Sequence, residues 1–389
     1  MIRILRLGFV TIFWIMVGAG ATPGPDDGAS HAMDQVEFTV DERRIVGEGR
    51  ILIEDTEGGV LLETTDGRRY IVNAENILSR KTDDRPFQVD EPEEAAQKVL
   101  RELPDGFRIH QTSHYTIISN TTNDYARWCG GVLEQLYRAF NTFWNGKYVD
   151  ITEPEFPLQV VIFSDRGQYI HATRNELGEA GASVLGFYSM TTNRITTFDA
   201  ANTLAMTDRR GRLNVRQIAS MPGMSENVRN LVHEATHQLA FNRGLMHRFY
   251  DTPRWYAEGM ACFFEVPDPG SNKGWGSLGE PNPLRIRQFA SMIARRSDGT
   301  LRLLENDDAL LMSDTAIDAY AEAYSIFFYL IKQRSPQLKK YIGRVLARQE
   351  SGAMEATSAE RLEDFESAFG PQQKFQDDLR KYWIRFHQE

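Results

Sequence analysis

The chain has 389 residues and a formal net charge of −10, and 41% of its residues are hydrophobic while 25% are charged. These proportions are ordinary for a soluble globular protein, and the length suggests one large or two moderate domains. Because nucleic acids and anionic lipid surfaces select basic patches, the acidic balance argues against both as partners.

The first 21 residues have the pattern of a secretory signal peptide. Arg3 and Arg6 form a short basic start, residues 7–17 are almost wholly apolar, and residues 19–21 make an A-x-A cleavage site. We therefore expect cleavage near Ala21 and a periplasmic or secreted protein, without stable membrane insertion after cleavage. An uncleaved signal anchor is the alternative that stays open.

A small all-β domain is expected next. Residues 22–35 are rich in Gly, Pro and Asp and predict a flexible leader. Residues 36–80 contain short alternating strands joined by turns such as Asp66-Gly67, which is typical of an SH3-like barrel or meander. We interpret it as a binding or regulatory appendage. Residues 81–91 are charged and contain a proline, so they predict a linker.

Residues 92–389 predict one larger domain that mixes helices and strands, so the fold class is α+β. Helical periodicity covers 92–102 and 128–144, and strands are expected over 107–119 and 158–163. Two further strands, 186–189 and 194–198, then form a hairpin. The C-terminal third is predominantly helical.

An HExxH pattern follows at His233-Glu234-Ala235-Thr236-His237, inside a segment of helical periodicity. Histidines four positions apart share one face of a helix, so both imidazoles can reach one ion. Glu234 between them then faces the position of a metal-activated water, from which a carboxylate can take a proton. The alternative is a core helix whose histidines bond to backbone carbonyls.

A second helix carries the candidate third ligand, Glu258. We expect Thr252 to cap this helix and Pro253 to be its first residue. The neighbours of Glu258 are small, among them Gly259, and would let this helix approach the first one closely. Three residues remain as rival ligands: His247, Asp251 and Glu265.

HExxH followed by a W-x-x-E-G helix at 255–259 resembles the gluzincin branch of zinc metallopeptidases, which includes thermolysin and the alanyl aminopeptidases. The resemblance implies a zincin-like domain with a mixed sheet, the HExxH helix and a C-terminal helical lobe. It implies Zn²⁺ held by His233, His237 and Glu258. The implied activity is hydrolysis of a peptide or protein substrate, with Glu234 as the general base.

Two further features are expected from this resemblance. Residues 320–330 are similar to an aminopeptidase helix whose leading tyrosine donates a hydrogen bond to the oxyanion, and that tyrosine aligns with Tyr320. Tyr324, one turn later, is the fallback. In such enzymes the substrate adds as a strand to an exposed sheet edge beside the HExxH helix. We assign that edge to Arg194–Phe198, with an ordinary sheet strand as the alternative.

The chain also departs from the families it resembles. Ala240 and Arg243 stand where metzincins have glycine and histidine, which excludes that branch. Cys262 stands where thermolysin-like enzymes place the aspartate that orients a histidine, so that partner is unidentified. The Gly-x-Met-x-Asn signature of aminopeptidases is absent from the sequence, which favours an endopeptidase.

Two other functions stay open. One is a non-catalytic, zinc-containing, peptidase-like binding protein of the cell envelope. Glu234 argues against it, because a structural zinc site needs no general base and usually has four protein ligands. The other is hydrolysis of a non-peptide amide or ester by the same site.

Cys129 and Cys262 are too few for a disulfide scaffold, although they could pair with each other.

Overall fold

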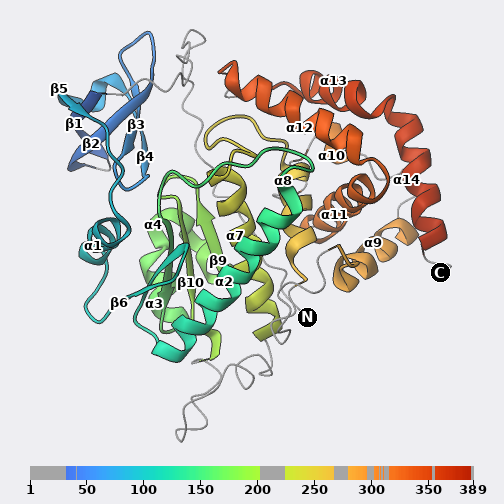
Figure 1. The fold of residues 1–389 in the computed structure, drawn as a ribbon, viewed down its shortest axis with the longest axis horizontal. Coiled ribbons are helices and arrows are strands. Elements are labelled where there is room, and N and C mark those ends of the chain that lie inside the picture. The colour runs from blue at the N-terminus through green and yellow to red at the C-terminus, as the bar shows by residue number, and fades with distance from the viewer. Residues whose placement is uncertain are drawn as a thin grey trace, which may run out of the picture.

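The computed structural model of the protein describes residues 32–40, 42–201, 224–266, 279–295, 302–305, 307, 310, 315–352 and 355–386. The expected signal peptide therefore lies outside the described residues. Within these ranges the protein is a mixed α+β structure with two sheets and an all-β N-terminal part (Figure 1). No helix among the described residues combines the length and apolar character that crossing a membrane requires.

The N-terminal part is a five-stranded antiparallel sheet in the order β4-β3-β2-β1-β5. Its strands are β1 (Ala32–Val40), β2 (Arg43–Glu54), β3 (Val60–Thr64), β4 (Arg69–Val72) and β5 (Ile77–Pro86). Alternate residues fill a small core of its own: Val36, Phe38, Val60, Leu62 and Val72. The all-β N-terminal part expected from the sequence is thus present.

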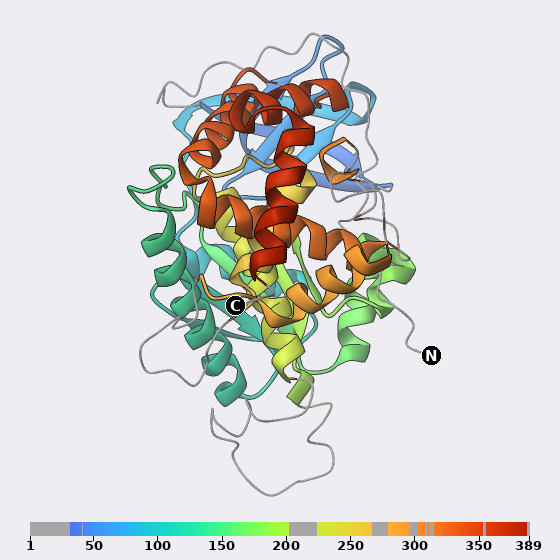
Figure 2. The ribbon, with the colours of Figure 1, turned by 90° about the vertical axis from the view of Figure 1, so that its right-hand side faces the viewer.

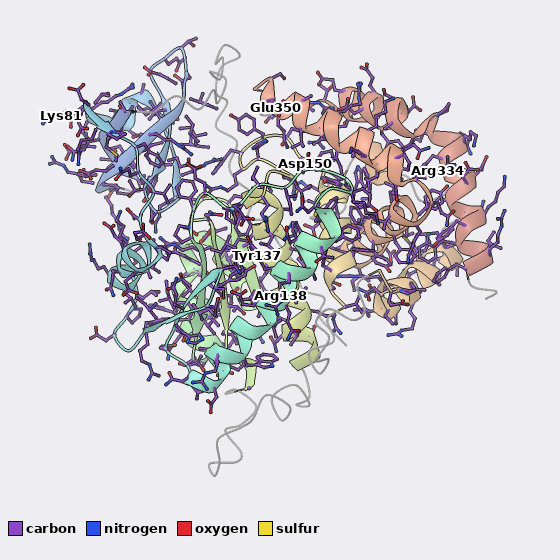
Figure 3. The ribbon with its side chains drawn as sticks, in the orientation of Figure 1. Lys81, Tyr137, Arg138, Asp150, Arg334 and Glu350 are labelled. Atoms are coloured by element: carbon purple, nitrogen blue, oxygen red, sulfur yellow. The ribbon has the colours of Figure 1, made fainter. Side chains whose placement is uncertain are left out.

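Both ends of this sheet extend beyond the expected bounds. β1 begins inside the segment expected to be a leader, and β5 occupies residues 81–86 of the segment expected to be a linker. β5 is an edge strand with exposed side chains, and charges on an edge strand prevent pairing with other chains. The charged residues of β5 therefore give this strand the composition of a linker. Figure 3 shows Lys81 of β5 at the outer rim of the sheet.

The second sheet is mixed, in the order β6-β7-β8-β10-β9. Its strands are β6 (Arg108–Gln111), β7 (Tyr115–Ser119), β8 (Leu158–Phe163), β9 (Gly186–Ser189) and β10 (Arg194–Phe198). β10 pairs in parallel with β8 on one side and antiparallel with β9 on the other. Our assignment of Arg194–Phe198 as the exposed edge is therefore wrong. The edge strand at this end of the sheet is β9, because the hairpin folds with its second strand inward.

Helices cover this sheet and form a C-terminal lobe (Figures 1 and 2). Before the HExxH segment come α1 (Pro92–Glu102), α2 (Asn123–Trp144), α3 (Arg166–Ala172) and α4 (Arg174–Leu177). The HExxH helix is α7 (Met224–Asn242), which packs against α2, β9 and β10. In the described residues after α7 the helices are α8 (Arg254–Phe264), α9 (Pro283–Arg295), α10 (Arg302–Glu305), α11 (Ala316–Gln333), α12 (Ser335–Glu350), α13 (Ser358–Phe369) and α14 (Gln372–Phe386).

Helix α8 packs closely on α11. A Cβ atom added at Gly259 would lie 2.5 Å from the carbonyl oxygen of Ala323 and 2.8 Å from the Cβ of Phe327. Gly259 thus permits close approach to α11, whereas the sequence led us to expect approach to the HExxH helix. The contact brings the first turns of α11 to the site. α8 also begins one residue later than expected, with Pro253 at the N-cap position.

Candidate metal centre

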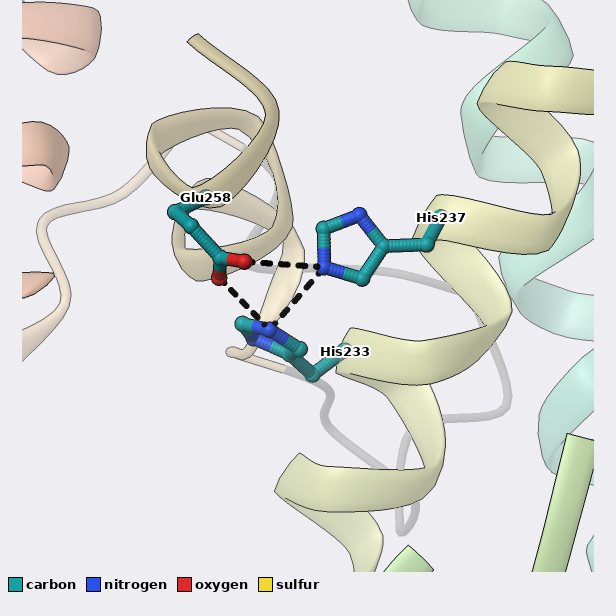
Figure 4. A group of neighbouring side chains, drawn as sticks. All are labelled: His233, His237 and Glu258. Carbon is teal, nitrogen blue, oxygen red and sulfur yellow. Dashed lines mark hydrogen bonds and ion pairs between the residues drawn. The ribbon is translucent and has the colours of Figure 1, made fainter. Parts of the chain in front are cut away.

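Three donor side chains from two helices converge at one point (Figure 4). His233 Nε2 lies 3.0 Å from Glu258 Oε2, and His237 Nε2 lies 3.7 Å from Glu258 Oε1. The two Nε2 atoms are 3.1 Å apart. All three side chains are buried. The residues that the sequence singled out as ligands are therefore brought together across α7 and α8.

These distances suit a divalent ion. In a tetrahedral site with bonds of about 2.1 Å, neighbouring donor atoms lie about 3.4 Å apart. The carboxylate oxygens of Glu258 are buried and face the two imidazoles. Burying a carboxylate is costly without a compensating charge. The group His233, His237 and Glu258 could thus hold a metal ion.

Electrostatics at the centre favour positive charge. Burial by itself raises the pKa of Glu258, but the two imidazoles overcome it and hold that pKa well below its usual range. Burial lowers the pKa of His233, while Cys262, Glu258 and Glu265 together raise it well above the usual value. Without a metal, the carboxylates would stabilise a proton on this imidazole. The same negative charge attracts a divalent cation.

Glu265 supplies the imidazole partner that the sequence left unidentified. Its Oε1 lies 2.8 Å from His233 Nδ1. A carboxylate accepts, so Nδ1 carries the proton and Nε2 presents its lone pair to the centre. We had considered Glu265 only as a rival ligand. The sequence spacing could have indicated this role. Glu265 follows Glu258 by seven residues, or two helical turns, so both side chains lie on the same face of the helix.

Besides His233, two residues hold Glu265 in place, Arg285 and Asn282. Arg285 donates from Nη2 to Oε1 at 2.8 Å and from Nε to Oε2 at 3.1 Å. Asn282 Nδ2 donates to Oε2 at 3.3 Å. Although burial raises it, the pKa of Glu265 is lowered to about 2 by Arg285 and His233. Glu265 is therefore an ionised, fixed acceptor for His233.

A second group of possible metal donors shares His233 with the first and adds Cys262 and Glu265. Arg285 already places its positive charge on both oxygens of Glu265, which opposes a cation there. Burial raises the pKa of the Cys262 thiol to about 11, so the thiol stays protonated. Cys129 and Cys262 are both free, so the pairing left open by the sequence does not occur in this structure.

Glu234 lies between α7 and the edge of the sheet. The backbone N–H of Tyr188, on β9, donates to Glu234 Oε2 at 2.9 Å. Asn230 Nδ2 donates to Glu234 Oε1 at 3.2 Å and lies 3.3 Å from the carbonyl oxygen of Gly186. Burial raises the pKa of Glu234 above its usual value, the direction expected for a carboxylate that accepts a proton. The side of β9 that is not paired with β10 thus contacts Glu234 and Asn230 of α7, beside the candidate metal centre.

Tyr320 lies at the centre and Tyr324 is engaged elsewhere. The Tyr320 and His233 rings are 6.0 Å apart between centroids, and the Arg285 guanidinium lies 5.3 Å from the centre of the Tyr320 ring. Burial raises the pKa of Tyr320 well above its usual value, so its hydroxyl keeps its proton. The Tyr324 hydroxyl accepts the backbone N–H of Asn282 at 2.7 Å.

The other rival ligands lie outside the donor groups. Asp251 pairs with Arg361 of α13 and lies 3.5 Å from Arg348 of α12. The backbone N–H of His247 donates to Gln349 of α12 at 3.1 Å. Neither Asp251 nor His247 belongs to a group of described residues close enough to share an ion.

Part of the chain matches a known family. Residues 227–350 match the family described as protein of unknown function (DUF1570). The matched segment is about a third of the chain and contains His233, Glu234, His237, Glu258 and Tyr320. No curated protein matches the chain.

Proposed function

We propose that the protein is a zinc-dependent peptidase with a gluzincin-like, zincin-type domain. The observation that carries the proposal is the carboxylate of Glu234, held by an edge strand beside three buried donors that can share one ion. His233, His237 and Glu258 would hold the ion with three protein donors, the number typical of catalytic rather than structural zinc sites. The two-histidine, one-carboxylate donor set suits zinc.

The chain's own residues have distinct parts in the proposed reaction. A zinc ion held by His233, His237 and Glu258 supplies Lewis acidity for the attacking water and for the scissile carbonyl. Glu234 takes the proton of the attacking water on a carboxylate oxygen and passes it to the leaving amine. Tyr320 donates a hydrogen bond to the oxygen on which negative charge develops.

The substrate main chain has a place to bind at β9. Gly186 and Tyr188 are two residues apart, so their backbone groups point to the same side of the strand, away from β10. A peptide that adds to this edge meets the Tyr188 N–H, which now bonds to Glu234. Such main-chain recognition favours an extended peptide. Together with the missing amine-binding signature, it favours an endopeptidase of the periplasm or the extracellular space.

A metal assay combined with a turnover assay tests the proposal. We expect one zinc per chain and hydrolysis of an unfolded protein that chelation abolishes and added zinc restores. Glu258→Ala should lose zinc, while Glu94→Gln, at an exposed residue of α1, should keep it. Zinc binding without turnover of any peptide would instead indicate the non-catalytic binding protein. Full turnover after chelation would refute a metal-dependent reaction.

A further inference from the structure

The hairpin between β3 and β4 contacts the segment directly after the edge strand. The backbone N–H of Arg69 donates to the carbonyl oxygen of Thr191 at 2.8 Å. Asp66, in the turn of the hairpin, accepts from Arg194 Nη2 at 2.8 Å, and Arg194 is the first residue of β10. The hairpin therefore contacts both sides of the turn that joins β9 to β10.

Arg248 connects the same hairpin to the metal-binding helices. It lies between α7 and α8, and its Nη1 donates to the carbonyl oxygens of Gly67 at 2.9 Å and of Met190 at 3.0 Å. Met190 is the residue directly after β9. One buried guanidinium thus joins the N-terminal hairpin, the end of the edge strand and the link between the two ligand-bearing helices.

A buried carboxylate anchors this junction. Glu63 is fully buried and accepts from Arg248 Nη2 at 3.1 Å, from Arg69 Nε at 2.7 Å and from Arg50 Nη2 at 2.6 Å. Arg69 Nη1 also donates to the carbonyl oxygen of Arg248 at 3.0 Å. Buried charges of this kind add little net stability but impose a specific arrangement, because each partner alone would be buried and unpaired.

The edge strand needs such support. β9 has four residues and one neighbouring strand, so few ladder hydrogen bonds hold it. In this structure the Tyr188 N–H donates to Glu234, and the position of β9 relative to α7 determines how close that N–H lies to the carboxylate. A fixed turn at 190–193 limits how far β9 can move from the helices.

We propose that the N-terminal sheet is a positioning part of the catalytic unit, in which the 64–69 hairpin and Arg248 hold edge strand β9 against α7. An effect of this arrangement on turnover rests on the proposed function. The holding of β9 against α7 does not. Arg248 is a positioning residue, since it contacts neither the donor group nor Glu234. The sequence had suggested a separate binding or regulatory appendage.

Amide hydrogen exchange on the full chain tests the proposal. Arg248→Gln should make the amides of residues 186–198 exchange on the order of tenfold faster, because their local opening becomes easier. Arg50→Gln is the control: it also removes an arginine from Glu63, but Arg50 is partly buried and bonds to Glu63 and Glu155 rather than to the 190–194 turn. Equal protection of 186–198 in the two variants would overturn the proposal.

If Arg248→Gln does not fold, the same exchange experiment is made on Arg248→Lys. It keeps the charge beside Glu63 but loses the planar fork that reaches Gly67 and Met190 together. We expect the same local increase in exchange, and unchanged protection would again refute the positioning role. In turnover assays, the lysine variant should keep zinc and raise KM more than it lowers kcat. Faster exchange in a protein whose wild type has no turnover would support the positioning role and refute the peptidase.

Discussion

The imidazole of His233 is fixed by Glu265, whose carboxylate lies 2.8 Å from Nδ1, on the side of the ring opposite to the metal donors. This contact decides which nitrogen is protonated and therefore which nitrogen can bind an ion. It also links the centre to Arg285, and through Arg285 to the ring of Tyr320.

Glu265→Gln should weaken zinc binding roughly 10–100-fold, as is usual when the hydrogen-bond partner of a ligand histidine is lost. The amide is a poorer acceptor than the ionised carboxylate, and it leaves Arg285 without its ion pair. Zinc titration against a competing chelator measures the change. Glu94→Gln is the control at an exposed position, and an equal affinity in both variants would contradict this role for Glu265.

Glu234→Gln should keep stoichiometric zinc and reduce kcat by about 10²–10⁴-fold, because the amide cannot accept the proton of the water. The amide oxygen can still accept the Tyr188 N–H, so the local structure should persist. Metal content and kcat are measured on the same sample. Turnover at the native rate would show that another group is the base.

Tyr320→Phe should reduce kcat by about 10²–10³-fold with little change in KM, since the lost hydrogen bond forms mainly in the transition state. The ring contact with His233 remains in the variant. Tyr324→Phe is the matched control on the same helix, and it removes the acceptor of the Asn282 backbone N–H. If Tyr324→Phe is the more damaging change, Tyr320 is not the oxyanion donor.

Gly259→Ala should destabilise the fold by about 1–3 kcal/mol, because the new methyl group would overlap the Ala323 carbonyl between α8 and α11. Denaturant unfolding measures the loss. Gly131→Ala is the control, in an exposed helical position where an added Cβ would meet nothing within 4 Å. This variant should be neutral or more stable by up to ~1 kcal/mol. Equal stability of the two variants would mean that the helices can separate without cost.

Local patterns predicted much of this molecule. Alternating residues indicated the N-terminal strands, and helical spacing indicated α7 and α8. The edge strand was misassigned because either strand of a hairpin can face the sheet, and only pairing with β8 decides which one does. The extent of β5 was missed because an exposed edge strand and a charged linker have the same composition.

The candidate metal donors could be predicted from the sequence because two of them lie one helical turn apart, a spacing that any α-helix converts into a shared face. The third donor, Glu258, follows on the next helix. The contacts of Glu265 with Arg285, of Glu234 with Tyr188, and of Arg248 with the N-terminal hairpin join segments distant in the chain. Tertiary packing alone decided these three contacts, because the periodicity of a segment does not indicate which distant segment it will pack against.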